Sequence, residues 1–162
     1  MTTFHGLIMA FVLIGSVSAV QIISKQWLFT LEQIKSMKII SRLTNLLFLG
    51  FIIFWGKGNF SADEMICLWV IWIMIYIIQK KSLRVSYEIL AEFLMENPRG
   101  IFIPQQLSFE GELYGDLLVN GVKMKAIAYG GVFFSGEPVK VSIFVELDIY
   151  GNIDKLLVNS IK

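Results

Sequence analysis

The stretch Val139–Ile149, VKVSIFVELDI, decides the fold of the second half of the chain. Its odd-numbered positions are all aliphatic, whereas its even-numbered positions hold Lys, Ser, Phe, Glu and Asp. Strict alternation directs one row of side chains into a core and the other mostly into water. The stretch therefore predicts a β-strand with Val141, Ile143 and Val145 facing inward, in a water-facing β domain that has its own small core.

The first half of the chain has the composition of membrane helices. The 162 residues are 56% hydrophobic and 17% charged, against about a quarter charged in soluble domains. Three apolar blocks cause this deficit: residues 1–24, which carry no Asp, Glu, Lys or Arg, Ile39–Trp55 and Met65–Ile78. A spanning helix needs about 17–25 residues. We predict a transmembrane region over residues 1–81, with spans at about 6–23, 39–56 and 63–79. A buried helical hairpin is the alternative for the second and third blocks.

The charges between the blocks predict an orientation. The loop after the first block is rich in Lys and Arg, and so is the stretch after the third, whereas the loop between the second and third is mainly acidic. Because basic loops favour the cytoplasmic side, the N-terminus is expected outside and the β domain in the cytoplasm, at a bacterial inner or plasma membrane. The competing interpretation is a signal peptide, since Val17-Ser18-Ala19 resembles a cleavage site.

The remaining segments are read from their periodicity. Residues 24–38 have an apolar stripe at helical spacing and predict an amphipathic helix. It is expected at the membrane interface, as a cytoplasmic extension of the first span, or as a connector that packs on its neighbours. Residues 82–98 predict a linker helix that ends at Asn97-Pro98. Residues 99–162 predict five strands, at about 101–109, 112–119, 122–129, 138–149 and 153–158. Asn120-Gly121 between the second and third predicts a hairpin turn, because both residues tolerate positive φ. Five short strands suit a small, partly open barrel of OB type, so the expected fold class is an α+β membrane protein.

The sequence offers little chemistry. His5, the one histidine, is next to the N-terminus, and the one cysteine, Cys67, lies in the third block. No metal-ligand spacing, phosphate-binding loop or serine triad can be assembled, so we predict no enzyme, no metal and no cofactor. The acidic residues Glu110, Glu112 and Asp116 cluster near one hairpin and could bind a cation, but solvated turn charges are the preferred interpretation. The net charge of +1 does not favour nucleic acid.

The glycine-rich loop at residues 130–136 is the predicted partner-binding site. Two phenylalanines, Phe133 and Phe134, occupy its tip, and Tyr129 adjoins it. Loops on a rigid scaffold often carry function, and exposed apolar tips suit a protein partner or a bilayer surface. The opposing interpretation is that one of the two rings fills the barrel.

A family resemblance supports the same architecture. The stretch Gly115–Val141, GDLLVNGVKMKAIAYGGVFFSGEPVKV, resembles the C-terminal domain of NfeD-like membrane proteins, over about residues 110–158. The resemblance implies several N-terminal spans followed by a cytoplasmic OB barrel. It also implies partnership with SPFH proteins, the stomatin, prohibitin and flotillin type, in membrane microdomains, and no activity for short members that lack the protease half.

Two functions are therefore expected from different classes. The first is a non-enzymatic membrane scaffold or accessory protein whose barrel docks a partner. A homo-oligomer is compatible with this function. The second is a small membrane effector or immunity protein that acts through oligomerised transmembrane helices.

Overall fold

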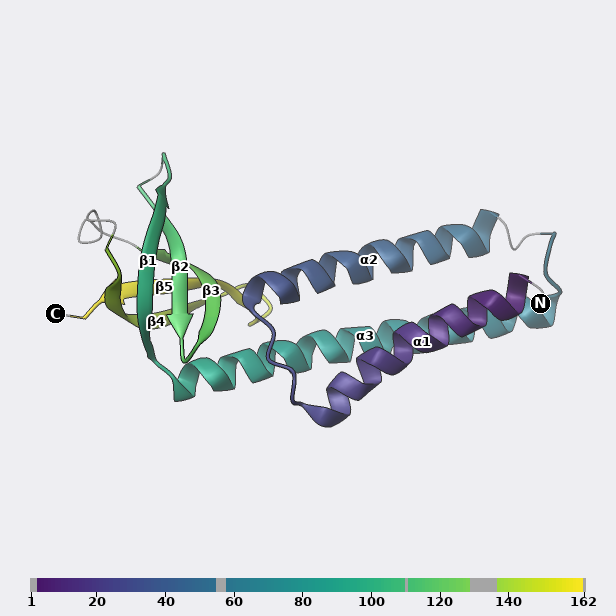
Figure 1. The fold of residues 1–162 in the computed structure, drawn as a ribbon. Coiled ribbons are helices and arrows are strands. Elements are labelled where there is room, and N and C mark those ends of the chain that lie inside the picture. Colours follow the sequence, from purple (N-terminus) through teal and green to yellow (C-terminus); the bar gives the residue numbers. More distant parts are fainter. Residues whose placement is uncertain (1–2, 55–57, 110, 129–136, 162) are drawn as a thin grey trace. The chain divides into compact units, whose positions relative to one another are not determined.

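The computed structural model is an α+β fold of three helices followed by a closed five-stranded β-barrel (Figure 1). It describes residues 3–54, 58–109, 111–128 and 137–161. The chain divides into two compact units. The helical unit comprises residues 1–27 and 35–86, and the barrel unit comprises residues 28–34 and 87–162.

The helices are α1 (Thr3–Ser24), α2 (Leu31–Phe54) and α3 (Ala62–Glu96). Both α2 and α3 begin with a reciprocal capping box, in which two side chains satisfy free backbone N–H groups. At α2, the N–H of Thr30 donates to Gln33 Oε1 at 2.9 Å, and the N–H of Gln33 donates to Thr30 Oγ1 at 3.4 Å. At α3, Ser61 and Glu64 make the same exchange at 2.9 and 3.3 Å.

The core of the helical unit is small and aromatic. Its buried members are Phe11, Phe48, Ile52, Leu68 and Ile75. The rings of Phe11 and Phe48 lie 3.8 Å apart between centroids. Trp69 and Trp72 pack against this core and meet edge to face at 5.6 Å, as expected for packing residues.

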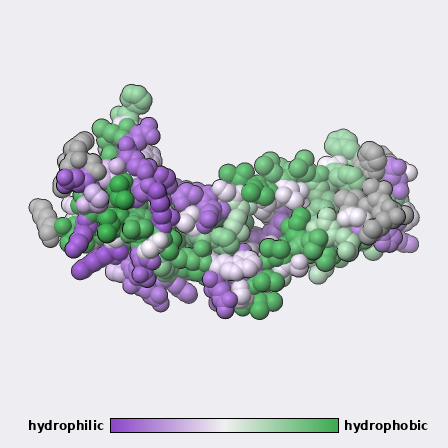
Figure 2. Space-filling view, viewed as in Figure 1, coloured by the Kyte–Doolittle hydropathy of each residue, from purple (hydrophilic) through white to green (hydrophobic). Residues whose placement is uncertain are grey.

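Most apolar side chains of the helices face outward instead. Only 17% of the most apolar stretch of α2, and of α3, is buried within the structure. Both helices are long and apolar enough to cross a membrane by length and composition, and α1 contains a shorter apolar helix, Ile8–Ser24. Figure 2 shows apolar residues over much of the helical surface on the side it draws.

Polar side chains, by contrast, lie between the helices. Gln21 of α1 accepts a 2.6 Å hydrogen bond from Ser82 Oγ of α3, and its amide donates to Ser86 Oγ. Gln79 of α3 accepts from Ser41 Oγ and from Asn45 Nδ2 of α2, each at 2.8 Å. Hydrogen bonds of this kind hold helices together where no water competes for the polar groups.

Two sequence-based helix predictions differ from the structure. The amphipathic helix predicted over residues 24–38 is wrong in extent, because α1 ends at Ser24 and helix resumes only at Leu31. Lys25 has a positive φ of 46°, which a continuing helix does not tolerate. The residues predicted as a linker helix are the C-terminal part of α3, which is continuous from the third apolar block and ends at Glu96.

The strands are β1 (Arg99–Leu107), β2 (Leu113–Val119), β3 (Val122–Ala128), β4 (Val139–Leu147) and β5 (Ile153–Ser160). They close in the order β1-β2-β3-β5-β4, with β1 paired to β4 and β3 running parallel to β5. In Figure 1, β1, β2 and β3 form one wall of the barrel and β4 and β5 complete it. The architecture fits the OB-like fold predicted from the sequence, although the barrel is closed rather than partly open.

The barrel interior is filled by side chains from all five strands. Phe102 is fully buried, and the other buried side chains of the strands include Leu117, Val119, Met124, Val141, Leu156 and Val158. A methyl group on Gly115 would lie 2.4 Å from the Ile103 carbonyl oxygen and 2.6 Å from Cζ of Phe102. The interior therefore requires glycine at position 115.

The alternation in β4 predicts the core only in part. Val141 is fully buried and Ile143 is half-buried, but Val145 is 43% exposed. The reason lies in the register. β4 pairs with β1 only through residues 139–142, so the later part of β4 extends past the barrel wall. The prediction that Val145 faces a core is therefore wrong.

Candidate functional site

The outer surface of β1, β2 and β3 combines apolar and charged side chains. Alternation points one row of each strand inward and the other outward. The outward residues, called the outer face below, are Ile101, Ile103, Gln105, Tyr114, Asp116, Leu118, Lys123 and Lys125. The strand register sets Ile101 opposite Leu118 and Asp116 between Ile103 and Lys125.

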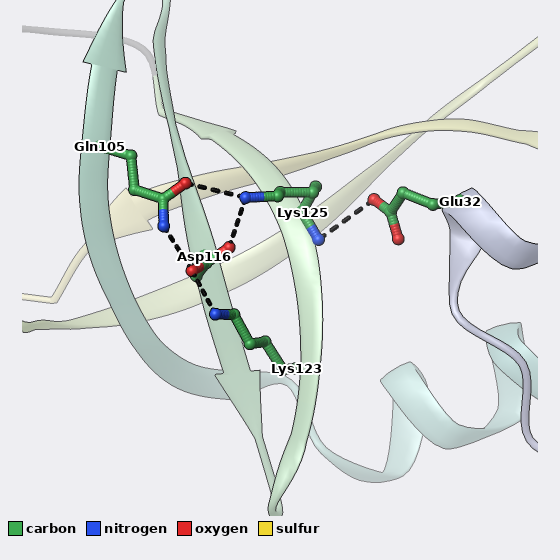
Figure 3. Close-up of polar contacts among 5 residues, drawn as sticks. All are labelled: Glu32, Gln105, Asp116, Lys123 and Lys125. Atoms are coloured by element: carbon green, nitrogen blue, oxygen red, sulfur yellow. Dashed lines mark hydrogen bonds and ion pairs between the residues drawn. The ribbon is translucent and has the colours of Figure 1, made fainter.

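A carboxylate lies at the centre of the outer face (Figure 3). Asp116 Oδ2 lies 2.6 Å from Lys123 Nζ, and Asp116 Oδ1 lies 2.6 Å from Lys125 Nζ. The Gln105 amide bridges the group, since it donates to Asp116 and accepts from Lys125 Nζ at 2.8 Å. Two ammonium groups and an amide thus enclose the Asp116 side chain, which is only 5% exposed.

This environment corrects the interpretation of Asp116 as a solvated turn charge. Hydrogen bonds from Lys123 and Lys125 hold the pKa of Asp116 below its ordinary value, although desolvation opposes them. The group is therefore ionised at neutral pH. Glu112 is also engaged, because it accepts from Tyr114 Oη at 2.6 Å and lies 3.9 Å from Lys155 Nζ. Glu110 lies outside the described residues.

A distant residue completes the outer face. β3 pairs with β5 only through Ile127 and Ala128, so the backbone N–H of Lys125 has no partner in that ladder. Glu32, in the first turn of α2, accepts this N–H through Oε1 at 3.1 Å (Figure 3). Leu31 and Ile34 beside it are buried. The short segment 28–34 thus protects the open edge of β3, a usual requirement for an exposed strand edge.

The sequence analysis did not predict that Glu32 contacts Lys125, although one local sequence pattern was relevant to this contact. The pattern Thr30-x-x-Gln33 is a capping box that marks the start of a helix at Leu31. This pattern would have shown that a new helix begins at Leu31 and is not a continuation of α1. The pairing of Glu32 with Lys125 itself spans 93 positions and leaves no local pattern.

The apolar part of the outer face remains accessible. Ile101, Ile103 and Leu118 are each 37–40% exposed. The two ammonium groups of Lys123 and Lys125 are matched in number by two carboxylates, those of Asp116 and Glu32, so the positive charge of the face is compensated. An apolar surface with compensated charge suits contact with another protein more than contact with a phosphate backbone.

The partner-binding residues predicted from the sequence, Tyr129, Phe133 and Phe134, lie outside the described residues, in the segment that joins β3 to β4. The two residues considered for metal or redox chemistry are His5 and Cys67. Both lie on helices and are exposed. In the part of the chain that the structure describes, no group of three His, Cys, Asp or Glu side chains could hold a metal ion.

Comparison with known proteins adds no relative to this picture. No protein-family model, curated protein or solved structure matches the chain.

Proposed function

We propose that this chain is a non-enzymatic integral membrane protein whose OB-like barrel docks a partner protein. The membrane part of the proposal rests on the helical unit, where apolar side chains face outward and amides and hydroxyls are enclosed. In water this arrangement would expose a large apolar surface, whereas in a bilayer it is the stable one. The three helices would span the membrane, with the N-terminus outside and the barrel in the cytoplasm, as the basic loops favour.

The outer face is the observation that carries the docking function. Ile101, Ile103 and Leu118 are exposed on the neighbouring strands β1 and β2, and Ile103 lies directly opposite Asp116 of the ion cluster. Exposed apolar patches with polar surroundings mark protein interaction sites. The family resemblance suggests an SPFH protein of the stomatin or flotillin type as the partner, in a membrane microdomain.

Paired substitutions test the docking function. The double change Ile101→Ser and Leu118→Ser removes one cross-strand pair from the outer face. It should abolish co-purification with an SPFH protein expressed in the same membrane and leave the barrel resistant to protease. Val145→Ser is the matched control, because Val145 is similarly exposed but lies on β4. If Val145→Ser reduced co-purification as much as the double change does, the partner would not bind specifically at the outer face.

The loop predicted from the sequence is tested separately. Phe133→Ser together with Phe134→Ser should also weaken partner binding if that loop contributes. A chain that ends at Glu96 tests the second class of function. If it retained the cellular phenotype, function would lie in the helices, as expected of an effector or immunity protein, and the docking proposal would be wrong.

A further inference from the structure

The strand β4 continues beyond the strand that covers one of its edges. β1 pairs with β4 only through residues 139–142, and the last backbone contact on that side is the N–H of Ile143, which donates to the Pro98 carbonyl at 3.0 Å. Pairing with β5 on the other side continues as far as Leu147. Within the described residues, this last part of β4 therefore has a strand partner on one side only. Residues 143–147 are called the β4 edge below.

The backbone groups of the β4 edge point in known directions. In a strand, the N–H and C=O groups of alternate residues point to opposite neighbours. The N–H of Ile143 points to the β1 side, whereas the N–H of Asp148 donates to the Asn152 carbonyl on the β5 side. Val145 and Leu147 alternate in phase with Ile143, so their N–H and C=O groups point away from β5. No backbone group in the described part of the chain pairs with them there.

Two other open edges of the barrel are protected. β1 leaves β4 after Phe102, and the next residue whose backbone faces that side is Pro104, which has no N–H to donate. The free N–H of Lys125 on β3 is bonded by Glu32. Proteins block strand edges in such ways because an unprotected edge pairs with other chains. The β4 edge has no proline, and no segment among the described residues bonds its outward backbone groups, so it can accept a further strand.

The side chains of the β4 edge indicate which strand would fit. Val145 and Leu147 are 43% and 57% exposed on one face of β4, and Phe144 is 55% exposed on the other. Glu146 is also exposed, on the same face as Phe144. An antiparallel strand would set two of its residues beside Val145 and Leu147 and one directly opposite Glu146. Apolar residues suit the first two positions and Lys or Arg suits the third, because opposite charges on facing residues stabilise a strand pair.

A second copy of the chain fits this edge poorly. An antiparallel pair centred on Val145 would need the backbone of Ile143, whose N–H is already bonded to Pro98. A pair centred on Glu146 sets the two Glu146 side chains opposite each other, and a pair centred on Leu147 sets Glu146 opposite Asp148. Like charges directly opposite are destabilising. The charges therefore favour a segment of another protein.

We propose that the β4 edge binds an extended segment of a partner protein as an added antiparallel strand, in which apolar residues alternate with Lys or Arg. Backbone hydrogen bonds to Val145 and Leu147 supply affinity, and the residue opposite Glu146 supplies selectivity. This inference goes beyond the proposed function, because it concerns a second surface of the barrel and depends neither on the outer face nor on insertion of the helices.

A synthetic peptide tests the added strand. Fluorescein-labelled Thr-Val-Lys-Val-Lys-Val-Thr is mixed with the full-length protein in detergent, and its anisotropy reports binding. We expect saturable binding. N-methylation of the valines, whose N–H groups face β4 in this pairing, should abolish binding, whereas N-methylation of the lysines should be tolerated. No binding, or equal effects of the two methylation patterns, would overturn the inference.

Two variants of the protein locate the contact. Val145→Pro removes an N–H that the peptide needs and should weaken binding by at least about tenfold. Val145→Ser keeps this N–H and is the matched control, so its binding should stay close to that of the wild type. Equal binding by the two variants would contradict pairing at the β4 edge.

Charge reversal tests the selectivity and does not depend on proline being tolerated. Glu146→Lys should prefer a peptide in which Glu replaces each Lys, whereas the wild type should prefer the lysine peptide. If Val145→Pro makes the barrel sensitive to protease, this exchange of preference decides the question. An unchanged preference would overturn the inference.

Failure of the proposed outer face gives a different result. The double change Ile101→Ser and Leu118→Ser should leave peptide binding unchanged. If this variant still co-purifies with the SPFH protein but binds the peptide normally, only the docking proposal is contradicted. If it loses the peptide while its barrel resists protease, the peptide binds at the outer face and the inference about the β4 edge is wrong.

Discussion

Truncation of Phe102 should remove most of the stability of the barrel. The ring is fully buried at the centre of five strands, and its edge defines the space beside Gly115. A buried Phe→Ala change costs about 3–5 kcal/mol through lost burial and the cavity left behind. A barrel of this size has a total stability of roughly 3–10 kcal/mol, at 0.05–0.15 kcal/mol per residue. The loss from Phe102→Ala is therefore comparable to the whole.

Brief proteolysis of the full-length protein along a urea series measures this loss. Tryptophan fluorescence is unsuitable, because all four tryptophans precede the barrel. With a slope of about 1 kcal/mol per molar urea, Phe102→Ala should lower the midpoint of barrel cleavage by about 3 M or abolish protection altogether. Phe144→Ala is the control, since Phe144 lies exposed on β4, and its effect should stay within about 0.5 kcal/mol. Similar shifts for both variants would refute the assignment of Phe102 to the core.

Three further predictions follow from named contacts. Gly115→Ala should cost about 1–3 kcal/mol by overpacking, measured by the same proteolysis midpoint, whereas Lys140→Ala, at an exposed site of β4, should be nearly neutral. Asp116→Asn should lower the midpoint at neutral pH. Because the folded pKa of Asp116 is depressed, the advantage of the wild type is fully present above the ordinary value of about 4 and shrinks as the pH falls below it; equal gaps at pH 7 and at about pH 3 would contradict this. Gln21→Ala should lower the melting temperature in detergent through the loss of contacts worth about 0.6–2 kcal/mol, whereas Ser16→Ala, whose hydroxyl bonds only its own helix, should not.

Local patterns predicted the elements of this fold well. Asn120-Gly121 predicted a hairpin because both residues tolerate positive φ, and both adopt it, at 46° and 83°. The stop at Asn97-Pro98 correctly predicted the end of α3 at Glu96. Each of these features depends on a few neighbouring residues, so the sequence contains the whole physical cause. The count and length of such strands predicted a small OB-type barrel, but a partly open one, whereas the barrel is closed.

Features that depend on register were not predictable. Alternation shows that Val141 and Val145 share a face of β4, but it does not show where the covering layer ends. That limit is set by the start of β1, some 40 positions earlier, and by its pairing with residues 139–142. The burial of Asp116 has the same kind of cause, since it requires Lys123 and Lys125 to lie beside it across β2 and β3.

The barrel is therefore not a contiguous piece of the sequence. Residues 28–34 precede the second helix, yet they belong to the barrel unit, where Leu31 and Ile34 are buried and Glu32 holds the free edge of β3. A fragment beginning at Arg99 would lack this cover and would leave the N–H of Lys125 unpaired. An uncovered strand edge invites pairing with other chains. The connection between α1 and α2 thus serves both units, because it joins two apolar helices and completes the fold of the domain that follows them.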